Sequence, residues 1–364
     1  MRVLVVNAGS SSLKLSVLDE SDEVVEQHDL EQWDGAAQDI AGAAGDWSCD
    51  AIGHRVVHGG PHLTQPVVVD ESVRDQIAAV TPLAPLHQPR ALAGIDATRT
   101  AWPHLRSVAC FDTAFHATMP EASATYAVPA DWRDRWPIRR YGFHGLSHRY
   151  ASRRAAELMG RPVDRLRLVT CHLGAGASLC AVKDGRSIDT TMGFTPLEGL
   201  VMATRSGTID PGLVLWLVRE AGLSPARVND ALEHESGVLA LAGTAKLEEV
   251  TDRAVLPSAE CHDRAVLALD VYVHRLLREL GAMVAVMGGV DGIVFTGGVG
   301  EHSAVVRSRA MNALAQFGVA LDEGRNDRAQ GDCLVSTADS KVTVLVVESR
   351  EDIEIARQVR GILS

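Results

Sequence analysis

The stretch VLVVNAGSSSLKLSVL, residues 3–18, decides the fold that we predict for this chain. Residues 3–7 are mostly β-branched and apolar, residues 13–18 alternate, and small residues lie between them, which predicts a strand–loop–strand hairpin. The stretch LRLVTCHLGAGASLCAV, residues 166–182, repeats this pattern once one residue is inserted. The repeat indicates two related halves that each open with a hairpin. A chance similarity between two glycine-rich hairpins is the alternative.

Short apolar runs alternate with stretches of helical periodicity in the rest of the chain. The further elements that we predict are strands at residues 108–111, 293–296 and 342–347, and helices at residues 302–318 and 352–362. This alternation predicts an α/β fold with layered sheets. The acidic segment 20–50 is expected to be a peripheral part of the first half, and the absence of a low-complexity linker predicts domains that pack closely around a cleft.

The composition bounds the function. The chain has 364 residues, which predicts two domains at about 150 residues per domain. Its residues are 46% hydrophobic and 23% charged, and this composition excludes a largely disordered chain. The net charge of −12 argues against a nucleic-acid or membrane surface, so neither partner is expected. The six cysteines form no C-x-x-C pair, and we expect no zinc site. We also expect no signal peptide and a cytoplasmic location.

The loop of the first hairpin, NAGSSSLK at residues 7–14, is a candidate phosphate site. Backbone N–H groups in such a turn can face phosphate oxygens, the hydroxyls of Ser10 and Ser12 add donors, and Lys14 adds a charge. The Walker pattern does not occur in the chain. An ordinary hairpin turn with a surface lysine is the alternative.

Two isolated arginines are candidates for binding an anion. Arg55 lies in the apolar stretch GHRVVHGG, residues 53–60, and Arg205 lies in the glycine-rich context TRSG, residues 204–207. An arginine in an apolar strand is costly unless it meets an anion. Two such arginines in an acidic chain fit the recognition of a transferring phosphoryl group, and structural salt bridges are the alternative.

An aspartate and a histidine complete the candidate catalytic set. Asp112 ends an apolar strand in FDTAFH, residues 111–116, where α/β folds place their sites, although it could instead cap a helix. His144 lies between glycines in YGFHG, residues 141–145. It either reaches a substrate or is a loop histidine whose hydrogen bonds are all made within the protein.

Two later segments are candidates for nucleotide and metal binding. TGGVGEHS, residues 296–303, joins a strand to a helix. Such a junction can bind an anion or a nucleotide at the start of the helix, and a plain strand–helix turn is the alternative. ESRED, residues 348–352, follows the last strand and offers a carboxylate for Mg²⁺. The alternative is that its acidic side chains only stabilise the start of the helix that follows.

These motifs, together with MGFTPLEG at residues 192–199, occur in the order found in acetate kinases, and the sequence resembles that family over nearly its whole length. The family belongs to the sugar kinase/heat-shock chaperone/actin superfamily. The resemblance implies two similar actin-like, ribonuclease H-like α/β domains around a nucleotide cleft. It places residues 1–114 and 350–364 in an N-terminal domain and residues 115–349 in a C-terminal, nucleotide-binding domain.

The resemblance also implies a reaction. It is the reversible, Mg²⁺-dependent transfer of the γ-phosphoryl group of ATP to acetate, giving acetyl phosphate and ADP, in a cytoplasmic homodimer, with Mn²⁺ as a substitute metal. The alternatives are a propionate or other short-chain acyl kinase, an enzyme with a pyrophosphate donor, and a catalytically weak sensor of nucleotide or acyl phosphate.

The motif match assigns the site residues. The catalytic residues that it implies are Arg55, Asp112, His144 and Arg205, and the metal-binding residues are Asn7 and Glu351. Those implied for the nucleotide are Ser10, Ser12, Lys14, His172, Leu173, Gly174, Ala175, Gly176, Lys246, Leu247, Glu248, Gly298, Val299, Gly300, Glu301 and His302. Those implied for the acyl substrate are Arg55, Val57, Leu86, His87, Phe143 and Pro196.

The chemistry limits what Asp112 can do. An acceptor carboxylate with a pKa of about 4 to 5 is already ionised at neutral pH and needs no general base. We therefore hypothesise that Asp112 orients Arg55, or Mg²⁺ through water.

The sequence departs from the family near the nucleotide. Ala175 stands where many members have Asn, and TAKLE at residues 244–248 replaces the common S-x-D-[FM]-R. Gly297 and His302 replace the commoner Ala and Asn. These changes leave the donor and the nucleotide preference open.

Overall fold

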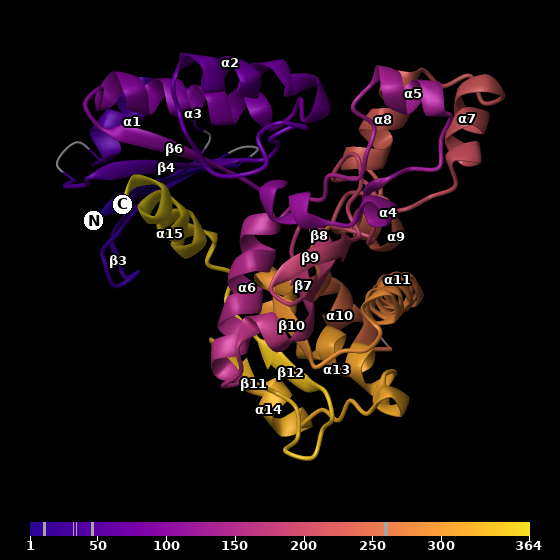
Figure 1. The fold of residues 1–364 in the computed structure, drawn as a ribbon. Helices are drawn as coiled ribbons and strands as arrows, with labels where there is room; N and C mark the ends of the chain where they lie inside the picture. The colour runs from indigo at the N-terminus through magenta and orange to yellow at the C-terminus, as the bar shows by residue number, and fades with distance from the viewer. Residues whose placement is uncertain (10–11, 32, 34, 45–46, 258–260) are drawn as a thin grey trace.

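The computed structural model describes the chain except residues 10–11, 32, 34, 45–46 and 258–260, and except the side chains of residues 12 and 37. Two six-stranded mixed sheets form its centre, and Figure 1 shows them in two lobes with helices around them. The first sheet has the order β3-β2-β1-β4-β6-β5. Its strands are β1 (Val3–Ala8), β2 (Ser12–Leu18), β3 (Val24–Glu31), β4 (Ala51–Val56), β5 (Val67–Val68) and β6 (Arg106–Phe111).

The second sheet has the order β11-β12-β10-β7-β8-β9. Its strands are β7 (Arg167–Leu173), β8 (Ala177–Lys183), β9 (Arg186–Thr190), β10 (Gly292–Thr296), β11 (Cys333–Leu334) and β12 (Thr343–Val346). Each sheet joins an antiparallel meander to two parallel strands and ends in a two-residue antiparallel strand. The prediction of two related α/β halves that open with hairpins is confirmed.

The strand registers locate the inserted residue of the sequence repeat. The last paired residues are Ala8 and Leu13 in the first hairpin and Leu173 and Ala177 in the second. Residues 9–12 therefore connect the first pair and residues 174–176 the second, so the first loop is longer by one residue.

Helices cover both faces of each sheet. The first sheet lies between α1 (Ala37–Ala44), α2 (Glu71–Ala79) and α3 (Gln88–Ala101) on one side and α15 (Glu351–Leu363) on the other, as Figure 1 shows. The second sheet lies between α6 (Gly145–Leu158) and α11 (His262–Met287). The remaining helices are α4 (Glu121–Ala124), α5 (Ala130–Arg135), α7 (Pro211–Arg219), α8 (Pro225–His234), α9 (Gly237–Ala242), α10 (Leu247–Val255), α12 (Gly297–His302), α13 (Ala304–Asn312) and α14 (Glu323–Asp327).

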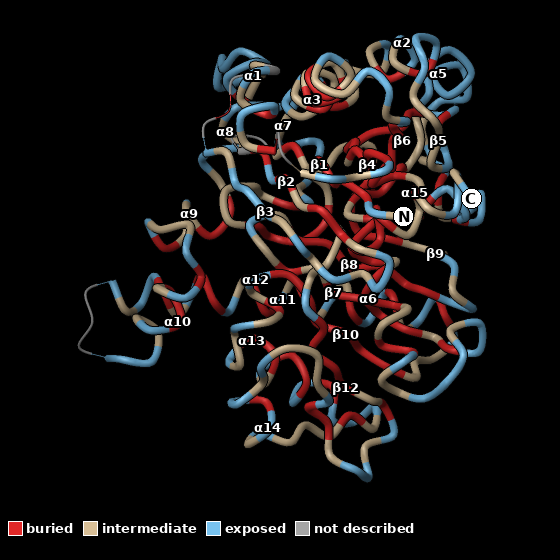
Figure 2. The backbone as a smooth tube through the Cα atoms, turned by 90° about the vertical axis from the view of Figure 1, so that its left-hand side faces the viewer, coloured by how far each residue is buried: buried red, intermediate tan, exposed pale blue. Residues whose placement is uncertain are grey.

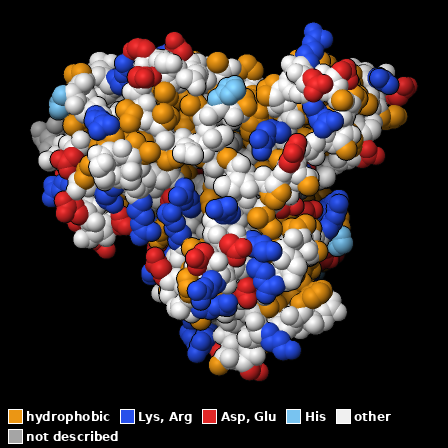
Figure 3. Space-filling model, in the orientation of Figure 1, with side chains coloured by type: hydrophobic (Ala, Val, Ile, Leu, Met, Phe, Trp, Pro, Cys, Tyr) orange, Lys and Arg blue, Asp and Glu red, His pale blue; other side chains and the backbone are white. Residues whose placement is uncertain are grey.

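The C-terminal helix α15 returns to the first sheet. It packs on β1 and β4, and a Cβ atom at Gly53 would lie 2.6 Å from Cγ2 of Ile355, so a larger residue would push the helix off the sheet. α15 also packs against α6, where the buried Glu354 lies 3.1 Å from Arg149 and 3.0 Å from Arg153. Figure 3 shows Lys and Arg side chains gathered over this junction of α6 and α15.

Most predicted elements are found, and one is wrong. The expected helix 302–318 is shorter: Ser303 accepts a hydrogen bond from the backbone of Val306 and begins α13, which ends at Asn312, and a 3-10 helix follows at Ala315–Phe317. The segment 20–50 contributes β3, an edge strand of the first sheet, as well as α1. Figure 2 shows buried residues along the strands of both sheets and exposed residues on the outer helices. No helix within the described ranges is long and apolar enough to cross a membrane.

Candidate active site

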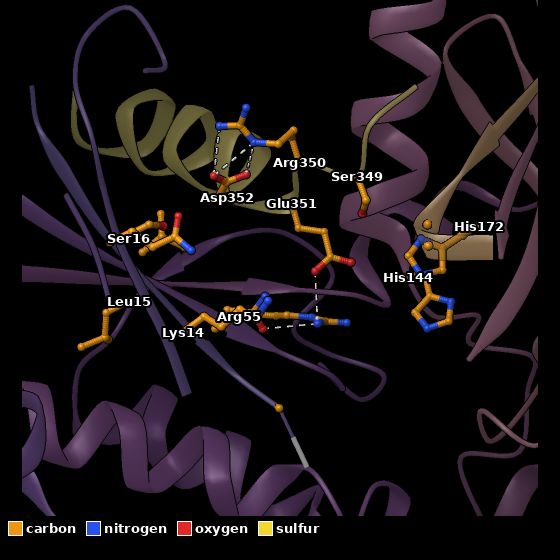
Figure 4. Close-up of a pocket in the computed structure, with 16 residues that line it drawn as sticks. Lys14, Leu15, Ser16, Arg55, His144, His172, Ser349, Arg350, Glu351 and Asp352 are labelled. Carbon is orange, nitrogen blue, oxygen red and sulfur yellow. Dashed lines mark hydrogen bonds and ion pairs between the residues drawn. The ribbon is translucent and has the colours of Figure 1, made fainter. Parts of the chain in front are cut away.

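Arg55 is the centre of the charged part of the site, shown in Figure 4. Its Nη2 and Nε donate to Oδ2 of Asp112 at 2.8 and 3.1 Å. Its Nη1 donates to Oδ1 of Asn7 at 3.3 Å and lies 3.1 Å from Oε2 of Glu351. Asn7, Arg55 and Asp112 come from the ends of the adjacent parallel strands β1, β4 and β6, and Glu351 opens α15. We call these four residues the charged cluster.

Burial controls the charges of this cluster. Asp112 is 1% exposed, and burial raises its pKa to about 6; the negative charge of Glu351 acts in the same direction, while Arg55 opposes it. Burial alone would lower the pKa of Arg55, but the charges of Asp112 and Glu351 raise it above its ordinary value. One guanidinium between two carboxylates leaves a surplus negative charge when all three are ionised, which suits a cation better than a bare phosphate.

The contacts of Asp112 decide between the two interpretations of its position. Its carboxylate oxygens accept from Arg55, and no N-cap bond is made by its side chain to the turn that follows. The helix-cap alternative is therefore wrong. The bidentate contact agrees with the hypothesis that Asp112 orients Arg55.

Asn7 and Glu351 offer oxygen ligands for a divalent cation. Both line a cavity of about 560 Å³ that also includes Lys14, Arg55 and His172. No group of three His, Cys, Asp or Glu residues that could hold a metal alone occurs in the described part of the chain. Mg²⁺ is usually held by one or two protein oxygens together with waters and substrate phosphates, and these two residues fit that requirement.

A second cavity, of about 200 Å³, adjoins the first. Arg55 and His144 line both cavities. The apolar walls of the smaller cavity are Val57, Phe143 and Pro196, and its polar walls include His87, Asp112 and Arg205. Burial, reinforced by the charges of Arg205 and Arg55, lowers the pKa of His87 to about 4, so this imidazole is neutral. Leu86 is 50% exposed and is not among the lining residues.

Arg205 reaches the small cavity from a loop held by two contacts. Its Nε lies 3.0 Å from Oε2 of Glu233 on α8. Gly237, at φ +65°, begins α9 so close to this loop that a Cβ atom would lie 2.2 Å from the carbonyl oxygen of Met202. The half-buried pair with Glu233 therefore fixes a guanidinium beside the cavity rather than on the open surface.

His144 is the N-cap residue of α6 and adopts a left-handed φ of 57°. Its Nδ1 lies 2.9 Å from Oγ of Ser178, and its ring lies 4.3 Å from that of His172. Burial, reinforced by His172, Arg55, His148 and Arg205, lowers the pKa of His144 well below 6.5. The side chain is thus a neutral imidazole at the wall of both cavities.

A third cavity, of about 840 Å³, continues from the first, because Gly298 lines both. It is bordered by the β7–β8 connection, α10, α12 and the start of α13. The predicted nucleotide residues that line it are Gly174, Ala175, Lys246, Leu247, Glu248, Gly298, Val299 and His302. Tyr272 also lines it, and its hydroxyl is buried with no hydrogen-bond partner among the described residues.

The remaining predicted residues lie around these cavities or outside the described part. His172 lines the 560 Å³ cavity and Gly176 the 200 Å³ cavity. Glu301 accepts from the backbone of Gly297 at 2.8 Å and of Ser349 at 2.9 Å, so it ties two loops together. Leu173 is buried in the core and Gly300 is buried in α12. Ser10 and the side chain of Ser12 lie outside the described residues.

Three polar residues of the site escaped the sequence analysis. Glu233, which pairs with Arg205, lies in α8, and no local pattern of the sequence distinguishes it from its neighbours. Ser178 follows the second hairpin loop, and the repeat itself pointed to that place. His148 lies four residues after His144, a spacing that puts both on one face of a helix and could have been noticed.

Two sheets of matching order adjoin two cavities, and Arg55 and His144 line both of them, an arrangement that fits a phosphotransferase acting on a carboxylate. The family model described as "Acetokinase family" matches residues 41–357. The chain belongs to the acetokinase family.

Known relatives match over the whole chain. The acetate kinase of Thermosipho africanus is 41% identical, with 100% of this chain and 98% of the relative covered. The crystal structure of Porphyromonas gingivalis acetate kinase is 37% identical and covers 100% of both chains with a TM-score of 0.92. That of a propionate kinase from Francisella tularensis is 32% identical and covers 98% of both chains with a TM-score of 0.90.

Proposed function

We propose that this protein is an acetate kinase, which transfers the γ-phosphoryl group of ATP reversibly to acetate and forms acetyl phosphate and ADP. The observation that carries the proposal is the pair of adjoining cavities. Arg55 and His144 line both of them, and Arg205 completes the smaller one. A phosphoryl group at their junction would therefore meet cations and a hydrogen-bonding imidazole.

The size of the small cavity supports a short acyl chain. Its volume of about 200 Å³ holds a carboxylate beside the arginines and a methyl group against Val57, Phe143 and Pro196. One extra methylene is worth only about 1–3 kcal/mol of discrimination. Propionate is therefore the second candidate, and the propionate kinase among the relatives favours keeping it.

The 840 Å³ cavity supports a nucleoside-bearing donor. Its walls include Ala203, Val238, Leu247 and Val299, which are apolar. Pyrophosphate has no apolar part to fill such a cavity, whereas a nucleoside triphosphate places its base and sugar there. This argues for ATP over the pyrophosphate alternative.

The chemistry is positioning and charge stabilisation. The acceptor carboxylate is ionised at neutral pH, so no residue has to remove a proton. Arg55 and Arg205 neutralise the oxygens of the acyl and phosphoryl groups, His144 hydrogen-bonds to the phosphoryl group, and the enclosed arrangement holds the reactants in line. Asp112 holds Arg55 in place and is a positioning residue.

Asn7 and Glu351 would hold Mg²⁺. When bound, the ion supplies charge neutralisation for the donor phosphates. Lys14, which lines the same cavity, adds a further cation for those phosphates. The surplus negative charge of the charged cluster supports this assignment.

We propose that residues 1–114 and 350–364 form one domain and residues 115–349 the other, because α15 packs on the first sheet.

We also propose that the protein is a cytoplasmic homodimer. Three apolar side chains of α7, those of Leu213, Leu215 and Trp216, are 45%, 53% and 55% exposed, and a second copy would cover them. Trp216→Glu should then halve the mass in light scattering, and a monomeric parent protein would contradict the dimer.

A steady-state assay tests the function. The purified protein is given acetyl phosphate and Mg²⁺ with ADP, GDP or inorganic phosphate as acceptor. We expect rapid ATP formation with ADP and, in reverse, a higher kcat/KM for acetate than for propionate or butyrate. Turnover with phosphate alone would identify a pyrophosphate donor, and ligand binding without turnover would favour the sensor.

A further inference from the structure

A chain of hydrogen bonds runs from His144 into the core. Nδ1 of His144 lies 2.9 Å from Oγ of Ser178, and the same Oγ lies 2.8 Å from Nε2 of His148. Nδ1 of His148 lies 2.7 Å from Oγ1 of Thr170. The last three side chains are fully buried. We call His144, Ser178, His148 and Thr170 the histidine chain.

The buried hydroxyl of Ser178 has one proton and, among the described residues, hydrogen-bonds only with the two rings, so that proton goes to one ring and the chain has one of two polarities. In the first, Thr170 donates to His148, His148 donates to Ser178 and Ser178 donates to Nδ1 of His144, so the proton of His144 is on Nε2. In the second, every bond is reversed and His144 carries its proton on Nδ1. Burial lowers the pKa of both His144 and His148 well below 6.5, so each ring has one N–H.

The surroundings of Thr170 favour the first polarity. In the second, the hydroxyl proton of Thr170 must find another acceptor, and the carbonyl oxygen of Cys180, at 3.5 Å, is the one found. A bond of that length is at the limit of a hydrogen bond, and a buried donor without a good partner is costly. In the first polarity the protons of Thr170, His148 and Ser178 each lie in a bond of 2.9 Å or less, and the Nε2 proton of His144 is the one left over.

We infer that Ser178, His148 and Thr170 are positioning residues that keep His144 in the tautomer with hydrogen on Nε2, the nitrogen left free of Ser178. That nitrogen lies near the cavity wall, because a Cβ atom at Gly176 would be 3.3 Å from Nε2 of His144 and 3.7 Å from Nη1 of Arg205. A neutral N–H donor is thereby aimed at phosphoryl oxygens, where a bare nitrogen would repel them. This inference rests on the proposed function only for the identity of the group that receives the hydrogen bond.

The tautomer is measured directly in the resting protein. Long-range ¹H–¹⁵N NMR spectra of ¹⁵N-histidine-labelled protein distinguish the two tautomers, and the His144 signals are assigned by their loss in His144→Gln. We expect Nε2 protonated and Nδ1 bare at neutral pH. The opposite tautomer, or a doubly protonated ring, would overturn the inference. This result does not depend on which reaction the enzyme catalyses, so it fails separately from the proposed function.

Variants of Thr170 test the role of the far end of the chain. Thr170→Val removes the donor that sets the polarity, so the protonated fraction of Nε2 and kcat should fall together, by about two- to threefold. Thr170→Ser keeps the hydroxyl and should restore both. Thr190→Val is the matched control, since the hydroxyl of Thr190 is also buried but bonds only to the carbonyl of Leu179, at 2.7 Å. A Thr170→Val protein that keeps the tautomer of the parent would contradict the inference.

Ser178→Ala tests the near end. We expect kcat to fall about tenfold while the KM values for acetate and ATP change less than twofold, because ring positioning is lost without loss of substrate contacts. A merely structural role would instead lower the melting temperature and leave kcat unchanged. An unchanged kcat in folded Ser178→Ala protein would also overturn the inference.

Discussion

The two sheets have the same strand order, yet their polar residues at the site have opposite character. At equivalent positions of the two hairpins, the first pairs Asn7 with Lys14 and the second pairs His172 with Ser178. The charged cluster beside the first sheet balances Arg55 against two carboxylates. The histidine chain beside the second sheet is uncharged.

This contrast shows how a duplicated scaffold can divide the work of phosphoryl transfer. The charged cluster provides oxygens for a metal and a guanidinium for the transferring group, and its ionised state depends on partners within 3.3 Å. The histidine chain provides a directed N–H donor whose orientation depends on buried hydroxyls. Substitutions in the first should therefore disturb charge balance, and substitutions in the second should disturb geometry alone.

The largest effect is expected from Arg55→Ala. We predict a fall in kcat of about 10³, because a preorganised charge on the phosphoryl oxygens is lost. The free energy of unfolding should also fall by about 3 kcal/mol, since Asp112 stays buried without its partner. Steady-state kinetics and urea denaturation measure both, and Arg55→Lys should lie between the two proteins. A kcat within tenfold of the parent would remove Arg55 from the site.

Asp112→Asn is expected to lower kcat by about 10², because a neutral amide loses the charge-assisted bonds that hold Arg55 and its NH2 group cannot accept from a guanidinium. The Mg²⁺ dependence should shift as well, since Glu351 then balances Arg55 alone. Rates are compared over a Mg²⁺ titration. A normal rate with a normal Mg²⁺ dependence would show that Asp112 orients neither group.

Glu233→Gln tests whether Glu233 holds Arg205 in place beside the small cavity. Losing the charge that holds Nε of Arg205 should lower kcat about tenfold. Glu235→Gln is the matched control, because Glu235 pairs with the exposed Arg227 at 2.7 Å, away from the cavities. If both variants behave alike, Glu233 has no positioning role.

The last expected effect is on stability at low pH and not on kcat. Burial lowers the pKa of His116 to about 4 in the folded chain, against about 6.5 when unfolded. The unfolded chain therefore binds more protons between these values, and this stabilisation is present above pH 6.5 and is lost as the pH falls towards 4. His116→Gln should reduce the slope of unfolding free energy against pH by up to about 1.4 kcal/mol per unit in this window. An unchanged slope would contradict a neutral buried imidazole.

Some site residues can be predicted from the strands that carry them. Asp112 is predicted because it ends an apolar run, and Arg55 because a charge in an apolar strand is costly unless it meets an anion. The parallel strands β4 and β6 bring the two together. The first hairpin is predicted from a β-branched apolar run, an alternating run and the small residues between them, and the second hairpin repeats this pattern.

Residues that act through partners distant in the chain cannot be predicted from local patterns. Ser178 and His148 meet only when β8 packs against α6, thirty positions apart in the chain. Glu233 reaches Arg205 across twenty-eight residues, which no local pattern encodes. The helix expected at 302–318 begins after the cap residue Ser303 and ends at Asn312, bounds that the periodicity of the sequence does not indicate.

We propose that both halves of the molecule act on one phosphoryl group, with Arg55 from β4 and Arg205 from the loop between β9 and α7. The most direct measurement is kcat for Arg55→Lys, Arg205→Lys and the double variant. If each single variant lowers kcat by about 10², we expect the double variant to be slower than the parent by about 10² to 10³, because groups that act on one transition state are not independent. A loss in the double variant equal to the product of the single losses would contradict it.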